Sequence, residues 1–349
     1  MSKVTPRILP ALIAMGFMSP TGQAADNAVI SQLNLRVASE PILGDLYPER
    51  RVSFPDGVIG LADVVYSATS AYRPLTMDLY LPPKASAMAL YPVIIYVHGG
   101  GWTSGHNREC GAIDHFPVFL ASLAKHGYVV ASLNYRLDGE ARFPAQIDDV
   151  RTAIRWLRAN AGRYHIDKMR FGVWGSSAGG HLAGLAATSC GIDFDGPSGA
   201  EPANARESAC VQAAVGWYGV YDFSTFNAQR AANVGEGSAP DSSVPGGSML
   251  GCKETASACA DVMRWASPVT YAARNNAPML LIAGLQDSVV PNQQSVEFNQ
   301  RLEAAGASSE LILIPGVSHS LIGKTPQETR AATEQAVAAT IAFFDRHLK

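Results

Sequence analysis

One pentapeptide carries residue types suited to nucleophilic catalysis. Residues 175–179 read Gly-Ser-Ser-Ala-Gly, follow an apolar segment at 169–174 and precede a run of helical period. A G-x-S-x-G sequence between a strand and a helix is typical of a tight turn that exposes a serine hydroxyl, and glycines at its ends avoid steric collisions. We therefore predict that Ser177 is the nucleophile and that the N–H of Ala178 faces a developing oxyanion.

A second glycine-rich loop is expected beside this turn. The sequence His-Gly-Gly-Gly-Trp at 98–102 directly follows an apolar segment at 93–97. Glycines let a backbone turn sharply and present bare N–H groups, so the amides of Gly100 and Gly101 are predicted to complete an oxyanion hole. No Gly-Lys-Ser/Thr follows, which excludes a P-loop. His98 and Trp102 are expected to brace the loop.

A serine hydroxyl needs a base, usually a histidine held by a carboxylate. His319 lies in a predicted loop between the last apolar segment and the C-terminal helix, and Asp287 follows a predicted strand at 279–283. The resulting chain order is Ser, Asp, His. Because all three follow strands, they are expected to meet at the carboxyl edge of one sheet.

Other polar residues near these motifs compete for the same roles. His181 is expected to point away from the hydroxyl, as a packed or hydrogen-bonded helix residue. Asp222 follows another predicted strand and remains a rival carboxylate, because a triad is defined by geometry. Arg136 is interpreted as a residue that ties a strand end to a helix. Asp148 and Asp149 are interpreted as surface or structural partners of Arg151 on that helix.

Strand and helix patterns alternate through most of the chain, which predicts an α/β class. Short segments apolar on both faces indicate a parallel sheet covered on each side by helices. These segments are 93–97, 128–133, 169–174, 211–217, 279–283 and 311–314, with alternating strands expected near 64–66 and 77–81. Helical periodicity is found at 147–157, 296–305 and 329–344.

Two stretches depart from the alternation. Residues 26–56 show little periodicity and are interpreted as an N-terminal arm. Residues 222–268 are rich in Gly, Ser, Ala and Pro, and we interpret them as an excursion between two strands, because a strand pattern resumes at 279. Such excursions commonly shape the substrate pocket. Residues 26–349 are thus predicted to form a single domain.

Composition excludes several classes. Of the 349 residues, 47% are hydrophobic and 16% charged, as in a packed globular protein. A formal charge of −3 and the lack of a basic run predict no nucleic-acid partner.

The N-terminus has the pattern of a secretory signal peptide. Lys3 and Arg7 precede an apolar run at 8–18, and small residues follow up to Ala24 and Ala25. The run is shorter than the roughly 20 residues that span a bilayer. We predict cleavage near Ala24/Ala25, removal of residues 1–25, no membrane span, and a secreted or periplasmic protein.

Cysteine usage agrees with export. None of the five cysteines forms a CxxC pair or has zinc-finger spacing to a histidine, so no metal site is expected. Nearness in sequence suggests disulfides between Cys252 and Cys259 and between Cys190 and Cys210, with Cys110 left over, although spacing alone does not determine connectivity. Five buried free thiols is the alternative.

Several of these segments together resemble the esterase/lipase branch of the α/β-hydrolase superfamily. The likeness spans about residues 58–349 and is strongest to bacterial acetyl-xylan/feruloyl esterase-like (BD-FAE-like) enzymes, near the hormone-sensitive-lipase group. It rests on the His98–Trp102 loop, Asn134-Tyr135-Arg136 with the following Phe143–Gln146 and Asp148-Asp149, the 175–182 turn, Ser267–Tyr271, and the Asp287 and His319 loops. The resemblance implies a triad of Ser177, Asp287 and His319 and an α/β-hydrolase fold. Ser176 is a departure, since the hormone-sensitive-lipase group typically has Asp there.

The resulting hypothesis is a serine carboxylic ester hydrolase without metal or organic cofactor. Its substrate is expected to be a small-molecule or glycan-linked ester, with a short-chain or an acetyl/feruloyl-type acyl group. One alternative is a serine peptidase like prolyl oligopeptidase, which shares the triad order but usually carries a propeller domain. The other is a non-catalytic binding protein on a hydrolase scaffold.

Overall fold

A computed structural model of the chain describes residues 50–68, 73–83, 88–192, 194, 204–234, 246–252 and 258–349. Residues 49–349 form one compact unit. The predicted signal peptide and nearly all of the predicted arm lie outside the described residues. The end of that arm differs from the expectation of little regular structure, because residues 50–53 form a strand.

Within the described residues, nine strands form one sheet. They are β1 (Arg50–Ser53), β2 (Ile59–Ser67), β3 (Leu75–Leu81), β4 (Tyr91–Val97), β5 (Val129–Leu133), β6 (Ile166–Ser176), β7 (Ala213–Trp217), β8 (Met279–Gly284) and β9 (Ser309–Ile314). The order is β1-β2-β3-β5-β4-β6-β7-β8-β9. Strands β1, β2 and β3 pair antiparallel with each of their neighbours, which includes the pairing of β3 with β5. Strands β4 to β9 are parallel to one another. The predicted mostly parallel sheet is confirmed.

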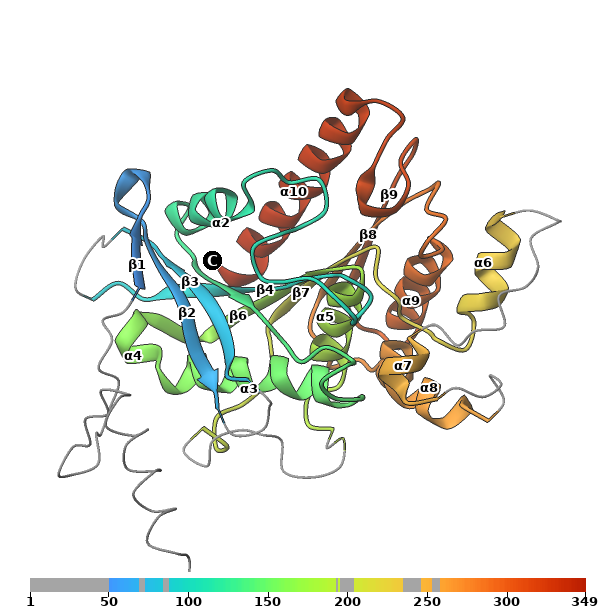
Figure 1. The fold of residues 1–349 in the computed structure, drawn as a ribbon, viewed down its shortest axis with the longest axis horizontal. Coiled ribbons are helices and arrows are strands. Elements are labelled where there is room, and N and C mark those ends of the chain that lie inside the picture. Colours follow the sequence, from blue (N-terminus) through green and yellow to red (C-terminus); the bar gives the residue numbers. More distant parts are fainter. Residues whose placement is uncertain are drawn as a thin grey trace, which may run out of the picture. The chain divides into compact units, whose positions relative to one another are not determined.

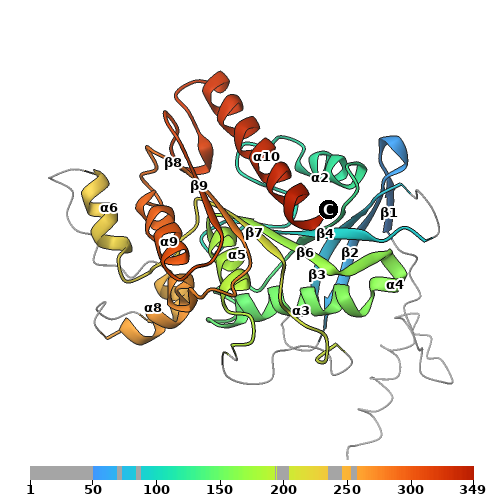
Figure 2. The ribbon, with the colours of Figure 1, turned by 180° about the vertical axis from the view of Figure 1, so that it is seen from behind.

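Helices cover both faces of the sheet (Figures 1 and 2). They are α2 (Phe116–Lys125), α3 (Ala145–Ala159), α4 (Ala161–Tyr164), α5 (Ala178–Thr188), α6 (Phe226–Val234), α7 (Gly247–Leu250), α8 (Ala260–Ala266), α9 (Gln293–Ala304) and α10 (Pro326–Leu348), with short 3-10 turns η1 (Pro55–Gly57), η2 (Pro268–Tyr271) and η3 (His319–Leu321). Helices α2 and α10 pack on one face, and α3, α5 and α9 pack on the other. Each face therefore has its own apolar core, which explains why the central strands are apolar on both sides.

Strand order brings two chain segments together at the middle of the sheet. After β4 the chain continues to β5 on one side of β4, whereas β6 pairs with β4 on the other side. Such a reversal opens a crevice at the carboxyl ends of the strands. The loop after β4 and the turn after β6 therefore become neighbours although nearly 80 residues separate them in sequence.

The excursion contains α6, α7 and α8 and lies in sequence between β7 and β8. A disulfide joins Cys252 to Cys259 within it. Another disulfide joins Cys190, just after α5, to Cys210, just before β7, and Cys110 is buried and free. The structure thus contains both of the suggested pairs.

A buried ion pair fixes helix α3 to the end of β5. The Arg136 guanidinium donates to both carboxylate oxygens of Asp149 over 2.6–3.0 Å, and the Arg136 backbone N–H donates to Asp149 as well. The tie predicted for Arg136 is confirmed. The Arg151 guanidinium donates to Ser189 and to the carbonyl of Ile192 near the end of α5, and its charge also acts on Asp148, so the pairing expected on this helix stays a prediction.

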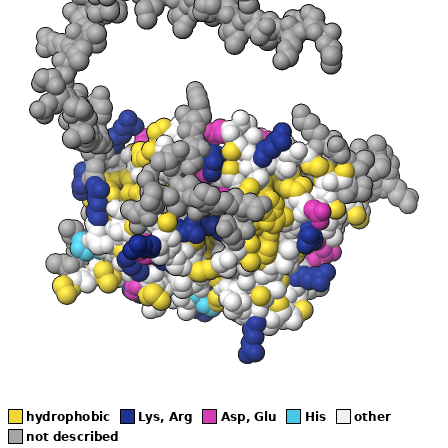
Figure 3. Space-filling model, turned by 90° about the horizontal axis from the view of Figure 1, so that it is seen from below, with side chains coloured by type: hydrophobic (Ala, Val, Ile, Leu, Met, Phe, Trp, Pro, Cys, Tyr) yellow, Lys and Arg dark blue, Asp and Glu magenta, His cyan; other side chains and the backbone are white. Residues whose placement is uncertain are grey.

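Figure 3 shows the molecule from below. In this view the visible Lys and Arg side chains lie in separate groups, with hydrophobic, other uncharged and some Asp and Glu side chains between them. Among the residues described, no helix combines the length and the apolar character needed to span a membrane.

We expect Arg136→Leu to lower the free energy of unfolding by about 3–5 kcal/mol, because it leaves the Asp149 carboxylate buried without its partner. Arg264→Ala, which removes an exposed ion pair with Asp261, is the matched control and should cost about 0–1 kcal/mol. Urea unfolding of both variants measures the difference. Equal losses would show that the Arg136–Asp149 pair contributes no more than a surface contact.

Candidate active site

Ser177 occupies the turn between β6 and α5 in a strained conformation. Its φ of 54° and ψ of −118° are rare for a residue with a side chain. The turn is possible only because its ends are glycines. A Cβ at Gly175 would collide with the carbonyl of Gly179, and a Cβ at Gly179 would collide with the carbonyl of Val97 at the end of β4. The turn thus holds the Ser177 side chain at the carboxyl edge of the sheet.

The structure brings the three predicted side chains together. His319 Nε2 lies 3.1 Å from Ser177 Oγ, and His319 Nδ1 lies 2.8 Å from Asp287 Oδ2. A carboxylate can only accept, so Nδ1 carries the proton and Nε2 is free to accept from the serine hydroxyl. The Asp287 side chain is fully buried, whereas that of His319 is 19% exposed. The imidazole is therefore accessible from outside, and the carboxylate is shielded.

Two backbone amides fix the acidic partner. The N–H groups of Val289 and Val290 each donate to Asp287 Oδ1 over 2.9 Å, which leaves Oδ2 for the imidazole. The Asp287 and His319 loops are also joined to each other, because the N–H of Gly316 donates to the Gln286 side chain over 2.6 Å. The orientation of the imidazole thus depends on two loops that follow the neighbouring strands β8 and β9.

The residues predicted as oxyanion donors also lie at this edge. Gly100 and Gly101 have φ values of 104° and 61°, which favour glycine, and a Cβ at Gly100 would collide with the carbonyl of Ser104. Ala178 is the first residue of α5, so its N–H has no carbonyl partner in a preceding turn. A Cβ at Gly99 would lie 2.9 Å from the carbonyl oxygen of Ser176, which shows how closely the two loops pack.

Buried histidines brace the glycine loop. His98 stacks on Tyr135 with ring centroids 4.3 Å apart, and its Nδ1 donates to the carbonyl of Gly99. The indole N–H of Trp102 donates to His181 Nδ1 over 3.1 Å, so His181 Nε2 must carry the proton donated to the carbonyl of Ala266. Both predictions, bracing by His98 and Trp102 and a hydrogen-bonded His181, are confirmed.

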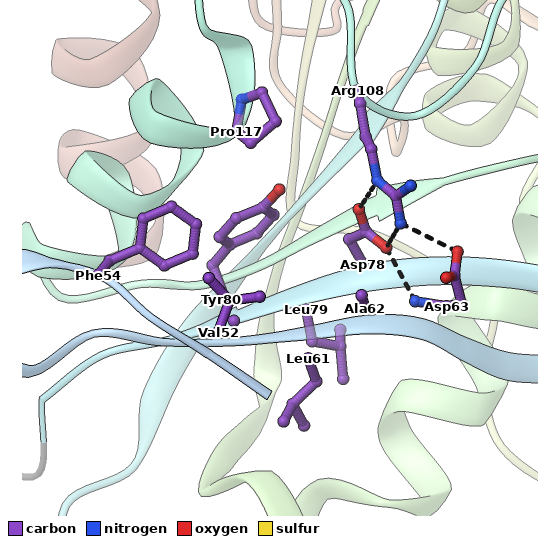
Figure 4. A pocket seen from close by; sticks show the side chains of 11 residues that line it. Val52, Phe54, Leu61, Ala62, Asp63, Asp78, Leu79, Tyr80, Arg108 and Pro117 are labelled. Carbon is purple, nitrogen blue, oxygen red and sulfur yellow. Dashed lines mark hydrogen bonds and ion pairs between the residues drawn. The ribbon is translucent and has the colours of Figure 1, made fainter. Parts of the chain in front are cut away.

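A charged anchor holds the rest of this loop to the sheet (Figure 4). Arg108 donates to both oxygens of Asp78 on β3, over 2.6 and 3.0 Å, and to Asp63 on β2 over 3.0 Å. The three charges lie at one end of a 350 Å³ cavity whose apolar wall includes Leu61 and Tyr80. No local sequence pattern marks Arg108, because its partners lie 30 and 45 residues away.

The rival carboxylate lies elsewhere. Asp222 accepts from the backbone and side chain of Ser224, over 2.8 and 2.5 Å, and its own backbone is held by Gln294. His319 instead pairs with Asp287. Geometry therefore favours Asp287 as the partner of the imidazole. The described residues contain no group of three or more His, Cys, Asp or Glu placed to hold a metal ion.

Comparison with known proteins gives the family. The BD-FAE family profile matches residues 77–302, well over half of the chain. The chain belongs to the BD-FAE family. An ethyl acetate hydrolase of Pseudomonas putida is 30% identical over 71% of each chain. Esterase LipC of Mycobacterium tuberculosis is 34% identical over 65% of this chain and 52% of its own length.

Solved structures agree with this assignment. A truncated carbohydrate esterase from gut microbiota superposes with a TM-score of 0.63 and 31% identity, over 80% of this chain and 96% of that one. The fold of the BD-FAE chain is thus the α/β-hydrolase fold. The chain spans about half the length of several curated relatives it matches, among them LipC and LipQ.

The bracing histidines make stability depend on pH. Burial lowers the pKa of His98 and of His181 to about 4 from an ordinary value of 6.5. Below pH 6.5 the unfolded chain therefore takes up protons that the folded chain does not, so stability is highest above pH 6.5 and falls as the pH drops toward 4.

We expect His181→Gln to destabilise the protein at pH 7 by about 1–3 kcal/mol through lost hydrogen bonds. Between pH 6.5 and 4 the unaltered protein should lose about 2–3 kcal/mol more stability than the variant, because the variant lacks this proton uptake while His98 acts in both proteins. Near pH 4 the variant should therefore be about as stable as the unaltered protein, or more stable. Urea unfolding at several pH values measures it, with exposed His115→Gln as the control. A loss independent of pH would contradict this role of His181.

Proposed function

We propose that the chain is a serine esterase that hydrolyses carboxylic esters through an acyl-enzyme on Ser177. The single observation that carries the proposal is the contact of His319 Nε2 with Ser177 Oγ at 3.1 Å while Asp287 holds Nδ1. This arrangement gives the hydroxyl a base in the correct tautomer. Membership of the BD-FAE family supports the same reaction.

In the first half-reaction Ser177 Oγ bonds to the ester carbonyl carbon and its proton passes to His319 Nε2. The carbonyl oxygen becomes an oxyanion, which the N–H groups of Gly100, Gly101 and Ala178 stabilise. The bond between the carbon and the alcohol oxygen then breaks, and the proton on Nε2 passes to that oxygen. The alcohol leaves, and the acyl group stays on Ser177.

The second half-reaction repeats these steps with water. Water bonds to the acyl carbon and gives a proton to Nε2, and the bond to Ser177 Oγ breaks as Oγ takes that proton back. The carboxylic acid leaves and the serine is restored. Asp287 stays ionised throughout and stabilises the imidazolium that forms in each half. The chain needs no metal or organic cofactor for either step.

The substrate class follows from the family and its members. We assign short-chain acyl esters, including acetyl- or feruloyl-type groups on small molecules or glycans. Support comes from a relative named as an ethyl acetate hydrolase and from a structural neighbour named as a carbohydrate esterase. The esterase names of these proteins favour ester hydrolysis over the peptidase and non-catalytic alternatives. Two disulfides and the N-terminal pattern support action outside the cytoplasm.

A comparison of kcat between two variants decides which of the two candidate carboxylates, Asp287 or Asp222, acts with His319. Asp287→Asn should lower kcat for nitrophenyl acetate by about 10⁴-fold, because the amide favours the wrong imidazole tautomer. Ser177→Ala should lower it by about 10⁶-fold. Asp222→Asn is the matched control and should stay within about twofold of the unaltered protein, since Asp222 pairs with Ser224. A large loss for Asp222→Asn with a small one for Asp287→Asn would reverse the assignment.

An ester panel tests the substrate class. We expect kcat/KM to be highest for acetyl to butyryl nitrophenyl esters and to fall for octanoyl and longer chains. Acetylated and feruloylated sugars in the same panel distinguish glycan-linked from simple esters, and aminoacyl-proline amides test the peptidase alternative. A preference for long-chain esters or for the amides would contradict the proposed substrate class.

A further inference from the structure

A cluster of buried hydroxyl groups lies behind the catalytic side chains. It consists of Tyr96 on β4, Ser176 at the end of β6, Tyr218 just after β7 and Ser320 in η3, and we call it the hydroxyl cluster. The Tyr96 hydroxyl lies 3.1 Å from Ser176 Oγ, and the Tyr218 hydroxyl interacts with the side chains of both Ser176 and Ser320. Tyr96, Ser176 and Tyr218 are each at least 97% buried.

The sequence positions of its members are significant. Ser176 directly precedes the nucleophile, and Ser320 directly follows His319. The hydroxyl cluster thus joins the residue next to the nucleophile to the residue next to the base. Ser177 and His319 are otherwise held by separate loops, after β6 and after β9.

The direction of the hydrogen bonds follows from proton counting. The Tyr96 hydroxyl donates its one proton to the carbonyl of Glu109, which can only accept. Ser176 must therefore donate to the Tyr96 oxygen, and its remaining lone pairs are available to Tyr218. The Tyr218 hydroxyl lies beside Ser176 and Ser320, and the buried Cys110 thiol is a further neighbour of Tyr96 and Ser176.

Tyr218 also contacts the base itself. Its ring meets the His319 ring edge to face, with centroids 4.9 Å apart. Its φ of 39° is rare for a side chain of this size and places the ring against the imidazole. The backbone is held there by a 2.6 Å hydrogen bond from the Tyr218 N–H to the carbonyl of Ile282 on β8.

We propose that Tyr218 is a positioning residue that fixes the His319 imidazole between Ser177 and Asp287, with its hydroxyl anchored through Ser176 and Ser320. The proposal rests on the proposed function, because it assigns how that reaction's base is held. The ring supports one side of the imidazole, and the hydroxyl prevents the ring from shifting. A misplacement of about 1 Å in a reacting group can cost about 10²-fold in rate.

The first experiment removes only the hydroxyl. For Tyr218→Phe we expect kcat for nitrophenyl acetate to fall about tenfold with KM within about twofold, since ground-state binding does not need the base. The acid limb of kcat/KM should move to lower pH, because a looser contact with Asp287 stabilises the imidazolium less. Tyr221→Phe is the matched control: Tyr221 is equally buried, but its ring stacks on Phe298 and its hydroxyl lies against Gly216 and Gly219.

A double-mutant cycle tests the anchor. If Ser176 and Tyr218 act as one unit, Ser176→Ala with Tyr218→Phe should lose little more than the worse single variant, whereas independent residues would multiply their losses. Proton NMR gives a readout without turnover. The Nδ1 proton of His319, assigned by its loss in His319→Gln, should move or broaden in Tyr218→Phe and stay unchanged in Tyr221→Phe.

The outcomes separate the two proposals. Normal kcat, pH profile and Nδ1 resonance in Tyr218→Phe, with activity lost in Ser177→Ala, would overturn the role of Tyr218 alone. An unaltered protein that hydrolyses no ester would overturn the proposed function, and the NMR comparison would still decide whether Tyr218 positions His319. Equal losses of kcat in Tyr218→Phe and Tyr221→Phe would show that the loss comes from general packing. That result would also contradict the positioning role of Tyr218.

Discussion

The backbone contact between the turn after β6 and the loop after β4 is the constraint on which the site depends. A Cβ at Gly175, Gly179 or Gly99 would strike a carbonyl of the turn itself or of the other segment. The two segments therefore pack backbone to backbone, and this closeness places the amides of one beside the serine of the other. It also holds Ser177 in a conformation that an isolated turn would not keep. The strand order β5-β4-β6 provides the contact, because it makes β4 and β6 neighbours with parallel ends.

Distance from this contact determines how each proposed catalytic side chain is held. Ser177 is fixed by local glycines, whereas Asp287 and His319 arrive from the loops after β8 and β9 and need supports of their own. Backbone amides hold Asp287, and packing with Tyr218 accompanies the contact of His319 with Ser177. The sheet brings the loops to one edge, and specific hydrogen bonds then fix the final positions of the side chains.

Much of this could be predicted from the sequence, because local patterns carry it. Apolar runs mark the central strands, and the position of Ser177 between a strand and a helix predicts its exposure. The order Ser, Asp, His fits both Asp222 and Asp287; the family resemblance favoured Asp287, and the geometry agrees. The rest depends on partners distant in sequence. Arg108, the contact of Arg151 with Ser189, and the hydroxyl cluster have no local sequence signature. Tyr218, for example, cannot be distinguished from other core residues until its contact with His319 is known. The family resemblance covered the motifs but not these supports.

The most direct test of the central claim is labelling with a fluorophosphonate probe, followed by mass spectrometry of the digested protein. The geometry predicts a single modified serine at position 177 in the folded protein, with labelling abolished by prior unfolding and strongly slowed in His319→Gln. Labelling at another serine, or none in a protein shown to be folded, would contradict the assignment of Ser177 as the nucleophile.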